Sequence, residues 1–113
     1  MSDCPFCLIA AGHAPAEVVY RWPDALAIVP LNPATPGHLL VISRVHVDSA
    51  TSDPVLAGLV AECAAELAVP PCNLIANCGA EASQTVPHLH WHIVPRRAGD
   101  GLKLPWTDQV VAA

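Results

Sequence analysis

The hydrophobic positions of the chain alternate in several short runs that have the period of β-strands. The run 17–22 alternates and is rich in β-branched and aromatic residues, and a Pro-Asp turn at 23–24 leads into the apolar run 25–29. These two runs predict a β-hairpin. The loop 31–37 contains two prolines and a glycine, which exclude regular structure, and an apolar strand is predicted after it over 39–42.

One longer segment has the spacing of an amphipathic helix. Asp53 is a typical helix N-cap residue, and Pro54 suits the first helical position. Apolar residues then recur three or four positions apart, which predicts the face that packs on the core: Leu56, Leu59, Val60, Cys63 and Leu67. The proline pair 70–71 ends the helix, and a strand is predicted over 73–76.

The last predicted strand begins at His88, after a polar loop over 78–87. Because strands and helices do not alternate strictly, the order of elements predicts an α+β domain, with a mainly antiparallel meandering sheet and one main amphipathic helix. A chain of 113 residues is long enough for one hydrophobic core, so we expect a single domain over 1–113. Its ends are an N-terminal knuckle over 1–12 and a C-terminal tail over 97–113.

The composition narrows the classes of partner. Apolar residues make up 53% of the chain and charged residues 13%, which argues against disorder and favours a homodimer that covers apolar surface. A net charge of −5 with five basic residues argues against a nucleic-acid partner. No apolar run is long enough to span a membrane and no signal-peptide pattern is present, so we expect a cytoplasmic protein with reduced cysteines.

Cys4 and Cys7 form a Cys-x-x-Cys pair near the N-terminus. In a reducing compartment such a pair indicates a metal site or a redox dithiol instead of a structural disulfide. A redox motif usually follows a core strand, whereas three residues precede Cys4, so the context favours a metal. Two unpaired surface cysteines are the third alternative.

Three histidines alternate in the run His88-Leu89-His90-Trp91-His92. On a strand, every second side chain lies on the same face about 6.7 Å from the last, so the imidazoles should line one face while Leu89 and Trp91 face the core. A lone histidine on such a strand is usually an ordinary half-buried residue. Three in alternation indicate a functional site.

Two chemistries could use this row of histidines. In the first they bind a catalytic zinc, but His88 and His92 lie about 13 Å apart along a strand, so only neighbouring pairs could share one ion. In the second, a neutral imidazole attacks phosphorus and carries the nucleotidyl group as a phosphoramide. Neighbouring histidines then stabilise the developing charge, and no magnesium is required.

The segment 88–94 is similar to the His-x-His-x-His-apolar-apolar signature of the histidine triad (HIT) family, and 36–42 resembles the upstream Gly-His segment of that family. Cys4, Cys7 and the Arg-x-His46 motif resemble its zinc-bearing branch. The matches extend from about residue 4 to residue 106. The resemblance implies an α+β domain that pairs into a dimer and hydrolyses or transfers a nucleoside monophosphate from amidates, dinucleoside polyphosphates or similar compounds.

The resemblance also implies a role for each matching residue. His90 would be the nucleophile, His92 would hydrogen-bond the phosphoryl or bridging oxygen, and His38 would support the nucleophile. Phosphate oxygens would be bound by three polar residues: Asn77, Gln84 and Thr85. The first histidine of the run is a metal ligand in zinc-bearing relatives, which implies a closed structural zinc site made by Cys4, Cys7, His46 and His88.

The chain departs from the family pattern at Pro30, where many relatives carry an Asp or Asn that binds the ribose hydroxyls. Asn32 could bind the ribose instead. The departure motivates an alternative function, a nucleotide-binding or regulatory protein without significant catalysis. A zinc hydrolase with the metal at His90 or His92 is the third hypothesis. Arg96 and Arg97 are expected to be a solvated strand end.

Overall fold

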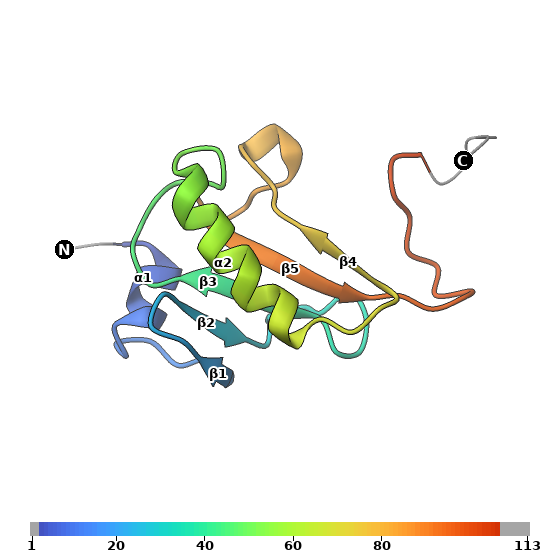
Figure 1. Ribbon diagram of the computed structural model, residues 1–113, viewed down its shortest axis with the longest axis horizontal. Coiled ribbons are helices and arrows are strands. Elements are labelled where there is room, and N and C mark those ends of the chain that lie inside the picture. Colours follow the sequence, from blue (N-terminus) through green and yellow to red (C-terminus); the bar gives the residue numbers. More distant parts are fainter. Residues whose placement is uncertain (1–2, 107–113) are drawn as a thin grey trace.

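A five-stranded sheet with one long helix across one face forms the body of the protein (Figure 1). The computed structural model describes residues 3–106, so positions 107–113 of the predicted tail lie outside the described residues. In chain order the elements are α1 (Pro5–Ala10), β1 (Val18–Arg21), β2 (Ala25–Ile28), β3 (Leu39–Ser43), α2 (Pro54–Leu67), β4 (Cys72–Ile75), the 3-10 helix η1 (Ala80–Ala82) and β5 (His90–Pro95).

The strands pair in the order β1-β2-β3-β5-β4, and every pair is antiparallel. This confirms the predicted α+β fold. The histidine strand β5 lies between β3 and β4, with His92 opposite Leu40 on one side and Ile75 on the other. Because β5 is an interior strand, its side chains have neighbouring strands on both sides.

The helix α2 covers one face of the sheet and begins where the sequence predicted. The Asp53 side chain accepts a hydrogen bond of 3.0 Å from the Leu56 N–H, as an N-cap should. The buried centre of the helix is made of Ala57, Val60 and Ala64, whereas Leu59 is 40% exposed. The prediction that Leu59 faces the core was wrong, whereas the predicted residues Leu56, Cys63 and Leu67 do pack against the buried cluster.

The opposite face of the sheet is covered in part by α1, a helix that the sequence pattern did not reveal. Its buried residue Phe6 packs in a cluster with Leu26, Ile28, Leu40 and Ile42, which point away from α2. The side chains of β2 and β3 therefore alternate between two apolar clusters, one under each helix.

The alternation predicted for the histidine run is confirmed. Leu89, Trp91 and Ile93 pack in the cluster under α2, while the rings of His88 and His90 contact Phe6 on the other face. The strand itself begins at His90 and not at His88. The Leu89 N–H bonds to the Val47 carbonyl in the loop after β3, so this N–H does not take part in the regular pairing of β5 with β3. Among residues 3–106, the helices are too short or too polar to traverse a bilayer.

Candidate active site and metal centre

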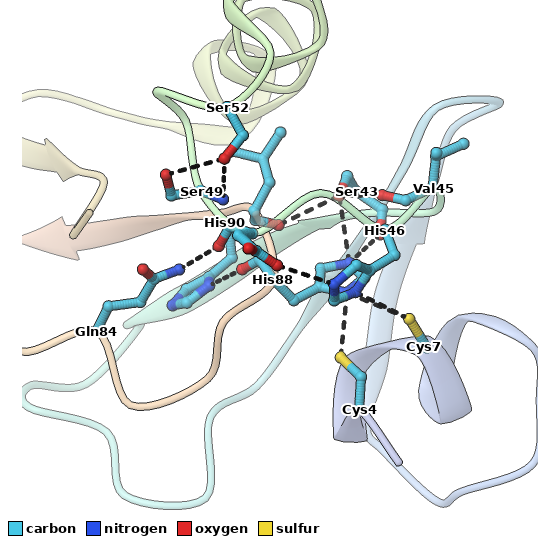
Figure 2. A network of polar contacts seen from close by, with 12 residues as sticks. Cys4, Cys7, Ser43, Val45, His46, Ser49, Ser52, Gln84, His88 and His90 are labelled. Atoms are coloured by element: carbon cyan, nitrogen blue, oxygen red, sulfur yellow. Dashed lines mark hydrogen bonds and ion pairs between the residues drawn. The ribbon is translucent and has the colours of Figure 1, made fainter. Parts of the chain in front are cut away.

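Four potential metal ligands converge where α1 meets the start of the histidine run: Cys4, Cys7, His46 and His88. Their ligand atoms all lie within 4.8 Å of one another. Figure 2 shows Cys4 and Cys7 directed from α1 at the two imidazoles, which face one another. These are the four residues that the family resemblance implied as a zinc site.

The distances between ligand atoms can be compared with those of a tetrahedral zinc site. Such a site with usual bond lengths places two nitrogens about 3.4 Å apart, and a nitrogen and a sulfur about 3.6 Å apart. The Nδ1 atoms of His46 and His88 are 3.2 Å apart, and the Nδ1 atom of His88 lies 3.3 Å from the Cys4 sulfur and 3.5 Å from the Cys7 sulfur. The cluster therefore fits zinc in donor type and spacing.

The outer nitrogens of both histidines have oxygen partners. The Nε2–H of His88 donates to the Ser43 carbonyl at 2.7 Å, which leaves Nδ1 of the neutral ring with its lone pair directed at the cluster. The Nε2 atom of His46 lies 3.3 Å from a carboxylate oxygen of Asp48. Metal-binding histidines usually have such partners, because these fix the ring and its tautomer.

A second pair of histidines lies further along β5. Nε2 of His38 lies 3.0 Å from Nδ1 of His92, and the Ala34 N–H donates to Nδ1 of His38 at 3.0 Å. Nδ1 of His38 is thus an acceptor, so a neutral His38 carries its proton on Nε2 and donates it to His92. His92 in turn carries its own proton on Nε2.

Burial keeps these imidazoles neutral. It lowers the pKa of His38, and it lowers the pKa of His92 to about 4, with the neighbouring His90 and His38 adding to the effect. At neutral pH, His92 is therefore a hydrogen-bond donor through Nε2–H and not a cation.

His90 lies between the metal cluster and the His38–His92 pair. Its Nδ1–H donates to the His88 carbonyl at 2.7 Å, so the lone pair of the neutral ring is at Nε2. Burial lowers the pKa of His90 and so favours this neutral form. The His90 ring is packed edge-on against Phe6 and lies 5.1 Å from the His92 ring, measured between centroids. This arrangement presents one nucleophilic nitrogen beside an N–H donor.

Residues 11–99 match the sequence profile of the HIT domain family. The chain belongs to this family. The crystal structure of a zinc-bound histidine triad family protein from Mycobacterium smegmatis has a TM-score of 0.76 and 38% identity to this chain, and the match covers 90% of this chain and 81% of that one. A HIT family hydrolase from Clostridium thermocellum has a TM-score of 0.77 and 30% identity, with coverage of 92% and 98%.

A curated relative, Adenylylsulfatase HINT3 of Arabidopsis thaliana, is 32% identical over 110 residues. The match covers 89% of this HIT protein but 56% of that one, so this chain spans little more than half of that relative.

The polar residues expected at the substrate site of this HIT protein fall into separate places. Asn77 lines a cavity of about 260 Å³ together with His38 and His92. Gln84 and Thr85 line a neighbouring hollow beside the start of α2. Both side-chain atoms of Gln84 are engaged, because Oε1 accepts from the Gly79 N–H at 2.7 Å and Nε2 donates to the Asp48 carbonyl at 2.6 Å. Asn32 is exposed in the loop before β3.

Sequence reasoning missed several residues that hold the site together. Phe6 contacts both His88 and His90, while Ser43 and Asp48 bond the outer nitrogens of the metal-cluster histidines. The only available signal for Phe6 was its position between Cys4 and Cys7.

The expectation that Arg96 belongs to a solvated strand end was wrong. Its guanidinium bonds Asp100 at 2.8 Å and 3.2 Å, the Asn73 side chain at 2.7 Å and the Leu102 carbonyl at 2.8 Å. The Arg96 guanidinium, with the N–H groups of Arg97 and Leu102, holds the pKa of Asp100 well below its usual range. These contacts of Arg96 with Asp100, Asn73 and Leu102, which we call the Arg96–Asp100 clasp, hold the segment 100–104. Part of this segment forms a wall of the cavity beside His38 and His92.

Proposed function

We propose that this HIT protein is a nucleotidyl hydrolase or transferase that forms a covalent nucleotidyl-histidine intermediate on His90. The observation that carries the proposal is the tautomer pattern: hydrogen bonds leave a lone pair on Nε2 of His90 and a proton on Nε2 of the adjacent His92. The family, a structural neighbour described as a hydrolase and a relative described as an adenylylsulfatase support it.

In the first step, the Nε2 lone pair of His90 forms a bond to the α-phosphorus of the substrate. The bond from phosphorus to the leaving group breaks, and its electron pair leaves with that group. A sulfate or phosphate departs as an anion, whereas an amine takes up a proton from solvent as it leaves. His90 becomes a cation in this step, and the His88 carbonyl, which accepts from Nδ1–H at 2.7 Å, stabilises it.

In the second step, water or another acceptor attacks the phosphorus, the nitrogen–phosphorus bond breaks, and the electron pair returns to His90. The proton lost by the attacking water or acceptor is released to solvent. The Nε2–H of His92 would donate to the phosphoryl or bridging oxygen during both steps. We assign His38 to orient His92. We further assign Asn77, Thr85 and the second hydrogen of the Gln84 amide nitrogen to the phosphate oxygens, and Asn32 to the ribose. Phosphoramidates, dinucleoside polyphosphates and adenylyl sulfate all carry a leaving group on the α-phosphorus. The bond that breaks is phosphorus–nitrogen in the first and phosphorus–oxygen in the other two.

The proposed cofactor is one structural zinc ion held by Cys4, Cys7, His46 and His88. When bound, it supplies a cross-link between α1 and the start of the histidine run, with no open position for substrate. The reaction should proceed without magnesium. We also propose a homodimer as the working form, because α2 and the edge strand β4 expose Val55, Leu59 and Leu74.

The test is single-turnover reaction with adenosine 5′-phosphoramidate and with adenylyl sulfate, followed by mass spectrometry of the acid-labile adduct. The parent should carry one adenylyl group on His90, and His90→Ala should lose activity by on the order of ten-thousand-fold while keeping its fold and metal. His13→Ala is the matched control, because His13 is exposed and lies outside the site. A His90→Ala variant with near-parental activity would refute the proposal.

Two other outcomes identify the rival functions. Nucleotide binding without any adduct or turnover would favour a non-catalytic binding or regulatory protein. A zinc hydrolase with the metal at His90 or His92 would be favoured by two results together. Activity would disappear on metal removal, and the Cys7→Ser variant would keep both its metal and its activity.

A further inference from the structure

The ring of Phe6 lies between the metal cluster and the proposed nucleophile. Its centroid is 5.7 Å from that of His88 and 5.0 Å from that of His90, and its plane is nearly perpendicular to both, at 83° and 85°. Only 7% of the residue is exposed. Edge-to-face contacts of this kind are favourable because the positive edge of one ring meets the negative face of the other.

Among residues 3–106, three contacts hold the His90 ring in the orientation that leaves its lone pair on Nε2. The Nδ1–H bond to the His88 carbonyl fixes one end of the ring, at 2.7 Å. His92 packs against it at 62°. Phe6 supplies the remaining aromatic contact. Rotation of the ring by half a turn would break the carbonyl bond and would have to displace the Phe6 ring.

Two potential metal ligands flank Phe6. Cys4 and Cys7 lie on either side in the sequence, and both direct their sulfur atoms at the His46–His88 pair (Figure 2). Cys4 is the N-cap residue of α1 and Cys7 lies within the helix, which has six residues and is too short to be stable by itself. A metal bound to Cys4 and Cys7 would therefore fasten the segment that carries Phe6.

We propose that Phe6 is a positioning residue for His90, and that zinc at the four-ligand cluster acts on the nucleophile by holding Phe6 against it. The inference rests on the proposed function of His90 as nucleophile. It gives the metal an indirect part in the reaction: zinc touches neither substrate nor His90, yet its loss releases the ring that keeps the Nε2 lone pair in place.

The primary test is long-range proton–nitrogen NMR of histidine-labelled, zinc-loaded protein, which reads the His90 tautomer without substrate. The parent should show His90 only in the Nδ1–H form, and Phe6→Leu should show a mixture of both tautomers with zinc content unchanged. The rate constant for adduct formation with adenosine 5′-phosphoramidate should fall about tenfold in Phe6→Leu. AMP affinity, measured by calorimetry, should change by less than that rate constant does.

Two variants serve as controls. Phe6→Tyr keeps the aromatic ring, so His90 in this variant should show the same single tautomer as in the parent. Ile9→Val alters another residue of α1, in the same apolar cluster and in the same groove beside Phe6, and should leave tautomer and rate unchanged. A single tautomer and a parental rate in Phe6→Leu would overturn the positioning role, as would an equal loss of AMP affinity, which would make the ring a substrate contact.

Removal of zinc by a chelator tests the second half of the proposal. The chelated parent should show the same mixture of tautomers as Phe6→Leu, and chelation of Phe6→Leu should add little, because both changes act through one contact. If chelation changes the tautomer equally in both proteins, zinc acts through the His88 carbonyl and the link to Phe6 is refuted. A parent that forms no adduct would refute the proposed function but would leave the tautomer result interpretable.

Discussion

The Nε2 atom of His38, on the loop before β3, lies 3.0 Å from the Nδ1 atom of His92 on β5. Since the Ala34 N–H occupies the other nitrogen of His38, the direction of donation along this pair is fixed by the backbone. The loop over 31–37 thereby determines that His92 presents an N–H to the cavity that both histidines line.

Replacement of His38 by phenylalanine keeps an aromatic ring and removes both nitrogens. Nδ1 of His92 then loses its donor, so the ring can take either tautomer and is no longer held in one orientation, and the phosphoryl oxygen loses a positioned N–H donor. The rate constant for adduct formation should fall by on the order of tenfold to hundredfold. Rapid-quench kinetics measure it, with His13→Phe as the control. An unchanged rate would exclude His38 from the reaction.

The low pKa of His92 makes stability depend on pH. Burial lowers this pKa from 6.5 to about 4, so between these values the unfolded chain binds more protons than the folded one. The stability that depends on a neutral His92 is complete above the unfolded pKa of 6.5 and is lost as the pH falls towards 4. The free energy of unfolding should therefore rise with pH between these two values.

Urea unfolding of the parent and of His92→Asn across this window measures the effect, because the comparison cancels protons bound by other groups. The slope of the free energy of unfolding against pH should be smaller in the variant. Equal slopes would show that His92 titrates normally in the folded protein.

Removal of one thiolate should abolish metal binding. Cys7→Ser should reduce bound zinc from one ion per chain to none, as measured by elemental analysis, because a closed site with four ligands tolerates loss of a thiolate poorly. At free zinc a hundredfold above the dissociation constant, the parent should gain about 2.7 kcal/mol of stability that the variant lacks. Cys63→Ser is the control, since Cys63 lies on α2 outside the cluster. Full metal content in Cys7→Ser would refute the ligand set.

The clasp between Arg96 and Asp100 should control the wall of the cavity. Asp100→Asn removes the charge that two guanidinium nitrogens contact at 2.8 Å and 3.2 Å. Hydrogen exchange over 100–104 should become faster, and KM should rise more than kcat falls, because the segment lines the cavity without carrying the nucleophile. Asp24→Asn, in an exposed turn, should change neither quantity. Slow exchange in Asp100→Asn would show that other contacts hold the segment.

Local pattern was sufficient for most of the architecture. The period of two placed His88 and His90 on the face opposite Leu89 and Trp91, and the Asp53 cap located the start of α2, because side-chain direction on a strand and capping at a helix end are set by neighbours in the sequence. The same pattern did not reveal α1, which at six residues is too short to show a helical period.

The sequence by itself determined which residues could do chemistry: three alternating histidines, one upstream histidine and a Cys-x-x-Cys pair. Only the tertiary structure decided how they act on one another. Residues 38 and 92 are 54 positions apart, and Phe6 is 84 positions from His90, so these contacts depend on strand register and on how α1 packs. The sequence pattern specifies which face of a strand a side chain occupies but not which residues it contacts. Those contacts fix the tautomer of each of these histidines, bury its imidazole and lower its pKa.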